Sequence, residues 1–385
     1  MTKKQNYILI GLIFITMAFM AVNDNVRGII IPTLKKDFSV SDGSMGIMLF
    51  VAYFAYMTFT YIGGVGLQKY SYKFILGLGI VLNILGFGMI YFSPNFYMFL
   101  VGLFVSNSGV GFMAIVINTV VPRINVGFQA ILMNMIHFCF GLGATLTHRV
   151  TGYLISSGLP WRNLYMAIGV VYSVLLLYTL LIKFPEVKKL SSKKSKVGKG
   201  SRKLLIFYMI ALGMYVSAEV HTSNWFVNYL KEVYSINENN ASVYTSIFFA
   251  VFAVGRLLGG IVAEKFGYVR TVLVSISLAF VLYLSGIIIG LKGMMMVSIS
   301  GLFFSIVFPT LVLSINRFFM NPVYITGLVM TAATGISMVI GLVIGFLNDT
   351  IGVYLSFYTI PVCLVISVCF TALIYREVRA LELLE

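Results

Sequence analysis

The sequence predicts an all-α membrane protein whose twelve transmembrane helices form two similar six-helix halves. Three observations predict it. Hydrophobic residues make up 59% of the 385 positions and charged residues only 10%, and the mean hydropathy is +0.98. The apolar residues fall into twelve stretches, each close to the roughly 20 residues that a span needs. One polar segment divides the chain near its middle. The high hydrophobic content and low charge exclude an ordinary soluble domain.

Each predicted span is an apolar stretch bounded by polar or turn-forming residues. The first follows Lys3 and Lys4 but is too long for the apolar core of a signal peptide and lacks a small-residue cleavage site, so we interpret it as a helix. The third, sixth, ninth and twelfth carry no charge in their interiors, as lipid-facing helices require. The predicted spans are 7–33, 44–67, 73–93, 96–121, 128–156, 162–184, 204–230, 240–264, 270–291, 293–316, 324–348 and 352–375.

The halves, 1–184 and 204–385, are joined by a basic linker, 185–203, which reads PEVKKLSSKKSKVGKGSRK. Its Lys, Ser and Gly content is typical of a flexible connection. The halves repeat at an offset near 196. GGVGLQKYSYK after the second span matches GGIVAEKFGYVR after the eighth, so that Gly64 corresponds to Gly260 and Lys69 to Lys265. A transport path between two such halves, near the bilayer midplane, is the expected consequence.

The net charge of +15 reflects membrane topology. With the N-terminus inside, 19 of the 27 Lys and Arg residues fall in cytoplasmic segments, five in outer loops and three within spans. This asymmetry predicts an inner-membrane protein in contact with lipid, with both termini cytoplasmic and no nucleic-acid partner. The three cysteines and three histidines form no ligand pattern, so no metal or cofactor is expected.

These parts together resemble the major facilitator superfamily. GGIVAEKFGYVR is similar to its second-half cytoplasmic signature, with Glu264 in place of an aspartate. Four segments resemble the fucose-galactose-glucose proton symporter branch: MNMIHFCFGLGA, GLPWRNLY, MYVSAEVHTSNWFVNYL and VGRLLGG. The resemblance implies a twelve-helix fold that works by alternating access. The chain departs from the fucose permease type because its fourth span has no carboxylate between Gly109 and Asn118.

Two carboxylates lie inside predicted spans, Asp24 in the first and Glu219 in the seventh, 195 residues apart. A carboxylate in hydrocarbon is costly unless it is paired, hydrated or protonated. Arg27, three residues after Asp24, can pair with it on one helix face; such a pair serves either insertion alone or coupling to a proton gradient. Glu219 has no basic residue three or four positions away, so it is expected to hold a proton near neutral pH, either as a proton carrier or as a permanently protonated group bonded to a neighbouring helix. Both are candidate proton-coupling residues.

Polar stripes mark candidate substrate contacts. One, in the fifth span, comprises Asn134, His137, Gly141, Thr145 and His148. Asn118 in the fourth span and Asn316 in the tenth end similar stripes. Amide and imidazole groups both donate and accept hydrogen bonds, which suits a polyol, although hydrogen bonding between helices is the alternative for any one of them. Tyr53, Asn224 and Trp225 add an aromatic face and an amide edge for a sugar ring, with an aromatic belt or core packing as the alternative for the aromatic residues.

The remaining candidates are charged residues and one glycine. Arg256 is assigned to a cytoplasmic gate, with a packing ion pair as the alternative. By resemblance, the gate also includes the loop residues Lys69, Gly260, Glu264 and Lys265. Arg149, in the outer half of the fifth span, is a charge partner or an anion-binding residue, as is Arg27.

The sequence therefore predicts a monomeric, non-enzymatic secondary transporter. It would import a sugar or similar small polar solute with protons, sodium remaining open as the coupling ion. Two alternatives remain: an exporter of drugs or metabolites, since 20 Met and 32 Phe suit an adaptable apolar cavity, and a carrier of sugar acids or other organic anions.

Overall fold

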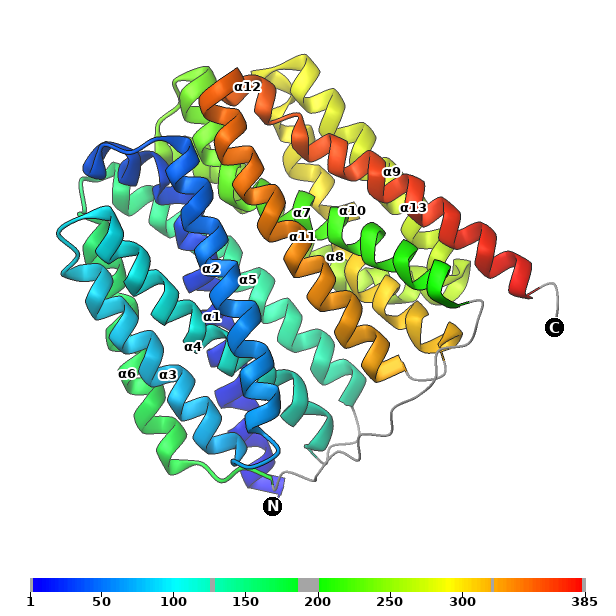
Figure 1. The fold of residues 1–385 in the computed structure, drawn as a ribbon, viewed down its shortest axis with the longest axis horizontal. Coiled ribbons are helices and arrows are strands. Elements are labelled where there is room, and N and C mark those ends of the chain that lie inside the picture. Colours follow the sequence, from blue (N-terminus) through cyan, green and yellow to red (C-terminus); the bar gives the residue numbers. More distant parts are fainter. Residues whose placement is uncertain (1–2, 125–128, 186–200, 320–321, 383–385) are drawn as a thin grey trace. The chain divides into compact units, whose positions relative to one another are not determined.

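The computed structural model describes residues 3–124, 129–185, 201–319 and 322–382. Over those ranges it consists of helices and the turns that connect them (Figure 1). The chain divides into two compact units, Met1–Ser192 and Lys193–Glu385. The first unit contains α1 (Lys3–Phe38), α2 (Asp42–Gly66), α3 (Tyr72–Tyr91), α4 (Phe96–Val120), α5 (Gln129–Ser156) and α6 (Trp161–Leu181). The second contains α7 (Ser201–Tyr234), α8 (Glu238–Phe266), α9 (Tyr268–Ile289), α10 (Met294–Phe318), α11 (Pro322–Ile351), the short α12 (Val353–Ser356) and α13 (Thr359–Glu382).

The described residues confirm the twelve long helices that the apolar stretches predict. Eleven of these helices are long and apolar enough to cross a membrane, and the twelfth, α5, is 28 residues long. The main difference is in the last span, which is predicted to begin at 352. There α12 is a separate turn and α13 begins at Thr359, with Pro361 in its first turn, where a missing N–H breaks no helical bond. Most of the predicted linker, 186–200, lies outside the described residues.

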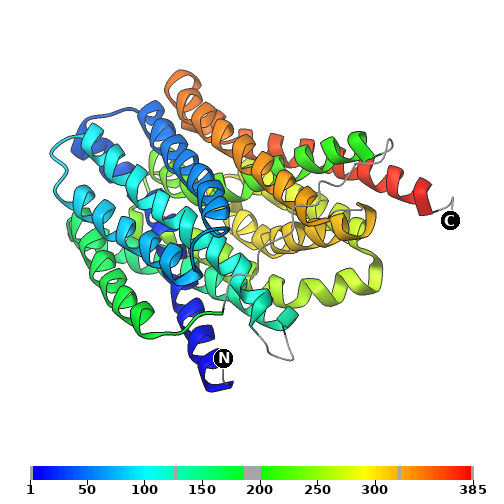
Figure 2. The same cartoon turned by 60° about the horizontal axis from the view of Figure 1, so that its bottom comes forward.

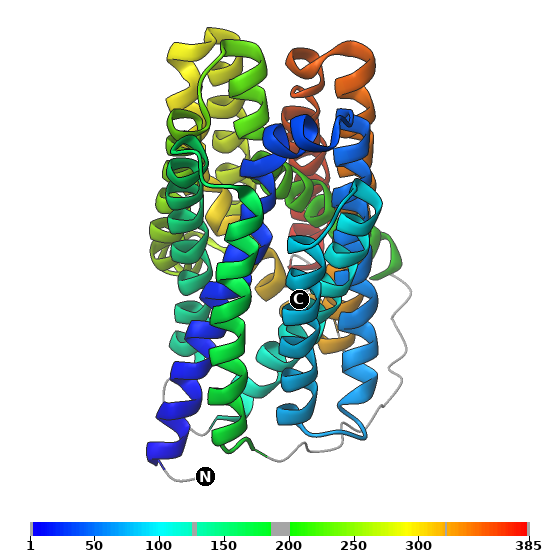
Figure 3. The same cartoon turned by 90° about the vertical axis from the view of Figure 1, so that its left-hand side faces the viewer.

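The two units repeat the same pattern of helix contacts. In the first, α1 packs on α5, α4 packs on both α2 and α3, and α3 packs on α6. In the second, α7 packs on α11, α10 on α8 and α9, and α9 on α13. Figure 2 shows α3 and α4 side by side, and Figure 3 shows α1 beside α6. The internal repeat therefore extends from the sequence to the packing.

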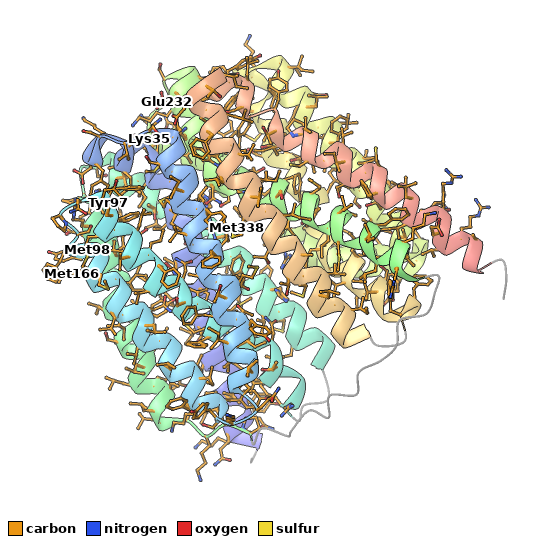
Figure 4. All side chains as sticks on the ribbon, viewed as in Figure 1. Lys35, Tyr97, Met98, Met166, Glu232 and Met338 are labelled. Carbon is orange, nitrogen blue, oxygen red and sulfur yellow. The ribbon has the colours of Figure 1, made fainter. Side chains whose placement is uncertain are left out.

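The two units agree residue by residue at the turn that joins the first two helices of each unit. Lys35 pairs with Asp42 across the first turn (Nζ to Oδ2, 2.9 Å), and Lys231 pairs with Glu238 across the second. Ser39 and Ser235 both have positive φ, 52° and 54°, and Ser41 and Asn237 both cap the next helix. Figure 4 labels Lys35 where α1 ends.

All these matches lie at an offset of 196 residues, which sets the register of the repeat. In that register Glu219 corresponds to Asn23, not to Asp24. Within their own units, the two membrane carboxylates therefore lie at helix positions that differ by one residue in the repeat, or about 100° of helix rotation.

Large apolar side chains cover the outer faces of both units. On the first, Tyr97 and Met98 of α4 and Met166 of α6 are 81%, 36% and 53% exposed, and they lie along one edge in Figure 4. The predicted peripheral spans carry exposed Leu, Val and Ile side chains, among them Leu85, Val174, Val281 and Val362. Surfaces of this kind match lipid chains, so the described protein is a multi-pass membrane protein.

Small residues allow the closest helix contacts. A Cβ at Gly109 of α4 would lie 2.3 Å from the carbonyl oxygen of Gly79 and 2.4 Å from Nδ2 of Asn83, both in α3. Gly86 and Gly102 make a second such contact between these helices. Backbone approaches of this kind replace the hydrophobic driving force that is lacking between helices in lipid.

We expect Gly109→Ala to lower the apparent melting temperature of the detergent-solubilised protein, because its Cβ meets a backbone oxygen that cannot rotate away; overpacking of this kind costs about 1–3 kcal/mol. Gly88→Ala is the matched control: it also lies in a helix of this unit, but a Cβ there has no atom within 4 Å. Equal melting temperatures for the two variants would contradict the described α3–α4 contact.

Candidate functional site

Arg27 is the centre of a polar cluster inside the first unit. Its side chain is 1% exposed, and one terminal nitrogen donates to Oδ1 of Asp24 at 2.8 Å. The other donates to Oδ1 of Asn107 in α4 at 3.2 Å. The guanidinium carbon also lies 5.6 Å from the ring centre of Tyr53 in α2. The predicted Asp24–Arg27 pair is present, and the cluster ties α1 to α2 and α4.

Asp24 is the more accessible member of the pair. Its side chain is 31% exposed, so the carboxylate reaches the edge of the cluster while the guanidinium stays inside it. One residue earlier, Asn23 donates from Nδ2 to Oδ1 of Asn83 in α3 at 3.4 Å. The hydroxyl groups of Tyr165 and Tyr172 in α6 are buried without a hydrogen-bond partner. The interior of this unit therefore has polar atoms available around the ion pair.

Glu219 is held by a different arrangement in the second unit. The hydroxyl oxygen of Tyr215, four residues earlier in α7, lies 2.5 Å from Oε2 of Glu219 and 2.7 Å from the carbonyl oxygen of Phe304 in α10. Arg256 of α8 interacts electrostatically with both Glu219 and Tyr215. Glu219 thus has a basic neighbour that lies on another helix, beyond the reach of spacing arguments along α7.

The two clusters lie at equivalent helix junctions. The first joins α1 to α2 and α4, and the second joins α7 to α8 and α10, which are the corresponding helices of the repeat. Each combines one carboxyl group with one arginine. In the first unit both charges come from one helix, whereas in the second the arginine comes from α8.

Arg256 keeps part of its donor capacity unused. Its guanidinium carbon lies 4.6 Å from the ring centre of Phe252, one turn earlier in α8. Its Nε is buried and has no hydrogen-bond partner. Sequence reasoning assigned Arg256 to a cytoplasmic gate or a packing ion pair; the structure places it within electrostatic range of Glu219.

The described residues of the predicted stripes differ in their burial and in their hydrogen-bond partners. Asn118 is exposed, and its Nδ2 donates to the carbonyl oxygen of Ala114 in its own helix. His148 is buried, with Nδ1 2.9 Å from the carbonyl oxygen of Ala144. His137 is partly buried. The side chains of Asn134 and Asn316 lie outside the described residues.

The aromatic and amide candidates of α7 are buried. Trp225 is 1% exposed, and its Nε1 has no hydrogen-bond partner. Asn224 is also 1% exposed and donates from Nδ2 to the carbonyl oxygen of Val220 at 3.0 Å. Tyr53 is partly buried beneath Arg27.

The loop candidates are exposed. Lys69, Gly260, Glu264 and Lys265 all lie at the surface of their own units. A Cβ at Gly260 would meet no atom within 4 Å, and Lys265 lies over the ring of Phe266. Arg149 is exposed on α5.

Sequence reasoning missed three buried polar residues that link helices within the units. Tyr215 lies four residues before Glu219, a spacing that predicts contact on a helix and was an available signal. Asn83 had no such signal, because its partner Asn23 lies 60 residues away. His221 is buried, and its Nε2 lies 2.8 Å from the carbonyl oxygen of Ser337 in α11.

The sequence pattern of the Major Facilitator Superfamily matches residues 12–331. The chain belongs to that superfamily. It is 24% identical over 335 residues to a putative glucose/galactose transporter of Helicobacter pylori, covering 81% of this chain and 82% of the relative. It is 23% identical over 394 residues to the L-fucose-proton symporter of Escherichia coli, covering 91% and 89%.

The fold agrees with this membership. A crystal structure of the superfamily transporter FucP in the outward conformation matches with a TM-score of 0.68 at 20% identity, covering 96% of this chain and 99% of that one. The predicted superfamily, and the predicted likeness to its fucose-galactose-glucose branch, are confirmed. As a transporter of this superfamily, the protein is not an enzyme.

We expect Asp24→Asn to destabilise the protein more than Arg27→Gln. Removing Asp24 leaves a buried guanidinium that cannot lose its charge, whereas removing Arg27 leaves a carboxylate that can take up a proton. Breaking a buried pair costs about 3–5 kcal/mol, and the double variant is expected to recover part of the loss. The measurement is the apparent melting temperature in detergent.

Lys203→Gln is the matched control, since it removes one partner of an exposed ion pair with Glu377, which is worth about 1 kcal/mol or less. If Asp24→Asn were no more damaging than this control, the Asp24–Arg27 pair would not be a stabilising feature of the first unit.

Proposed function

We propose that the protein imports a neutral hexose or 6-deoxyhexose together with protons, by alternating access between its six-helix halves, 1–184 and 204–385. The observation that carries the proposal is the pair of carboxyl–arginine clusters at equivalent junctions of the two units. Membrane-interior carboxyl groups are costly and characteristic of ion-coupled transport. The names of the two relatives supply the substrate class and, for one of them, the coupling ion.

In the proposed cycle, Glu219 is the proton carrier and Asp24–Arg27 is the charge-neutral counterpart in the first half. A proton suits the surroundings of Glu219 better than sodium does. Sodium needs several oxygen ligands, whereas a proton needs one carboxyl oxygen, and the described neighbours of this carboxyl group are a hydroxyl group and a guanidinium group, which has no acceptor atom. Protons rather than sodium are therefore the proposed coupling ion.

Each half is proposed to contribute groups that bind the sugar. In the second half, Trp225 offers a ring face and an Nε1–H without a partner, and Asn224 lies beside it in the sequence of α7; in the first half, Tyr53 of α2 offers an aromatic ring. Asn118, Asn134, His137 and Asn316 stay candidate hydroxyl-binding groups. Arg27 is already bonded to Asp24 and Asn107, which favours a neutral sugar over a sugar acid.

The proposed topology follows the distribution of basic residues. Both termini and the exposed loop residues Lys69, Glu264 and Lys265 lie on the cytoplasmic side of the inner membrane. There these loops, with Gly260, act as the gate, while Arg149 lies in the outer half of α5. The working unit is proposed to be a monomer.

The experiment is uptake of labelled fucose, galactose and glucose into proteoliposomes that contain the purified protein. With an inward proton gradient, we expect one or more of these sugars to accumulate above the outside concentration. A protonophore abolishes the accumulation, and replacing sodium with potassium leaves it unchanged. Glu219→Gln is expected to bring the sugar only to equal concentrations on both sides, because the driving force is no longer coupled.

Glu377→Gln is the control and is expected to retain accumulation. Glu377 is an exposed glutamate near the end of α13 that pairs with Lys203. Accumulation that survives the protonophore would exclude proton symport. Uptake of glucuronate in place of the neutral sugars would favour the anion carrier, and outward movement of dyes would favour the exporter.

A further inference from the structure

The hydroxyl group of Tyr215 faces two acceptor positions but carries one hydrogen. Its oxygen lies within hydrogen-bond distance of both Oε2 of Glu219 and the carbonyl oxygen of Phe304. A main-chain carbonyl oxygen and an ionised carboxylate only accept, whereas a protonated carboxyl group also donates. Because the one hydrogen points fully at only one acceptor, both contacts are full two-centre hydrogen bonds at once only if Glu219 is protonated and donates to Tyr215, which donates to Phe304.

We propose that the described arrangement is the protonated state of Glu219. Tyr215 is then a positioning residue whose hydrogen bond to α10 is present in this state and lost when Glu219 is ionised. The inference rests on the proposed function of Glu219 as the proton carrier. When Glu219 loses its proton to water, the electron pair stays on the carboxylate. The single hydrogen of Tyr215 then turns to the carboxylate, because charge-assisted hydrogen bonds are the stronger ones. The link from α7 to Phe304 is lost.

The point where Tyr215 meets α10 is a weak place in that helix. Pro309 lies inside α10, and its missing N–H leaves the carbonyl group of Ser305 without its usual donor. Phe304 is the residue immediately before Ser305. A change in the hydrogen bond from α7 therefore acts beside the turn where α10 is least able to resist bending.

Helix α8 lies directly against the same segment. A Cβ at Gly255 would lie 2.1 Å from Oγ of Ser305 and 2.6 Å from the carbonyl oxygen of Leu302. Arg256, the next residue, interacts with Glu219 and has a buried Nε without a partner. This donor is available to the carboxylate once Glu219 has lost its proton. Deprotonation thus exchanges a link from α7 to α10 for an attraction between α7 and α8.

The other helices packed against α7 present mainly neutral groups along it. Helix α9 contributes the hydroxyl of Tyr283, bonded to Thr222. Helix α11 contributes the Ser337 carbonyl at His221, the other ionisable side chain in the middle of α7, and α13 contributes Ser367. Within the described residues, Arg256 is the charged side chain that acts on Glu219.

Infrared spectroscopy of the purified protein tests the protonation state without any substrate. We expect a carbonyl stretching band of a protonated carboxyl group at neutral pH that Glu219→Gln removes. Glu377→Gln is expected to leave that band in place, because Glu377 lies at the surface in an ion pair with Lys203, outside the Glu219 cluster. If Glu219→Gln removed no such band, Glu219 would be ionised in this state and the proposal would be overturned.

The role of Tyr215 is tested with Tyr215→Phe, which keeps the ring that packs near Phe304. The Glu219 band is expected to persist but to shift to higher wavenumber, because the carboxyl hydrogen loses its acceptor. Proton-driven sugar accumulation is expected to fall about tenfold, the effect of one charge-assisted hydrogen bond, while sugar exchange at equal proton concentrations continues.

Tyr208→Phe is the matched control. Tyr208 is also a buried tyrosine of α7 bonded to α10, with its hydroxyl oxygen 2.8 Å from Oγ of Ser314. It is expected to alter neither the Glu219 band nor the ratio of accumulation to exchange. If Tyr215→Phe behaved like Tyr208→Phe in both measurements, Tyr215 would be structural only. Absence of sugar transport by the wild type, with the band and its shift observed, would overturn the proposed function and retain the hydrogen-bond assignment.

Discussion

The neutralisation of ionisable groups inside the helices is the constraint on which the structure depends. A charge in the membrane interior is tolerated when a partner cancels it or when the group binds a proton. The first unit uses the former solution, with Asp24 and Arg27 three residues apart on α1. The second uses elements of both, since Glu219 has a hydroxyl partner on its own helix and an arginine on α8.

These clusters also tie helices together. Arg27 reaches Asn107 in α4, and Tyr215 reaches Phe304 in α10. Helices in lipid gain little from hydrophobic burial against one another, so close glycine contacts and polar links contribute much of their association. A change in the protonation of Glu219 therefore alters the packing of its unit as well as its charge.

The helices were predictable from the sequence because the bilayer requires long apolar segments, and each of the twelve stretches meets that requirement by itself. The repeat was also visible at an offset near 196, but the pairing of Asp24 with Glu219 was one residue out, because these carboxylates lie 195 residues apart. The structural matches at Ser39 and Ser235, and at Lys35–Asp42 and Lys231–Glu238, give 196.

The site was less predictable. Spacing along one helix predicts contacts three or four residues apart, so the Asp24–Arg27 pair could be anticipated. Contacts between helices, such as Glu219 with Arg256 or Asn23 with Asn83, depend on how the helices rotate and pack. A single sequence gives no direct measure of either. For the same reason Asn118, which lies on a regular polar stripe, is exposed and bonded within its own helix.

The central claim is that movement of a proton on Glu219 accompanies movement of the sugar. The most direct measurement is the external pH of a weakly buffered suspension of de-energised vesicles containing the protein, recorded as sugar is added. The account predicts alkalinisation when the sugar enters, and none with Glu219→Gln. Sugar entry at an unchanged external pH in the wild type would contradict it.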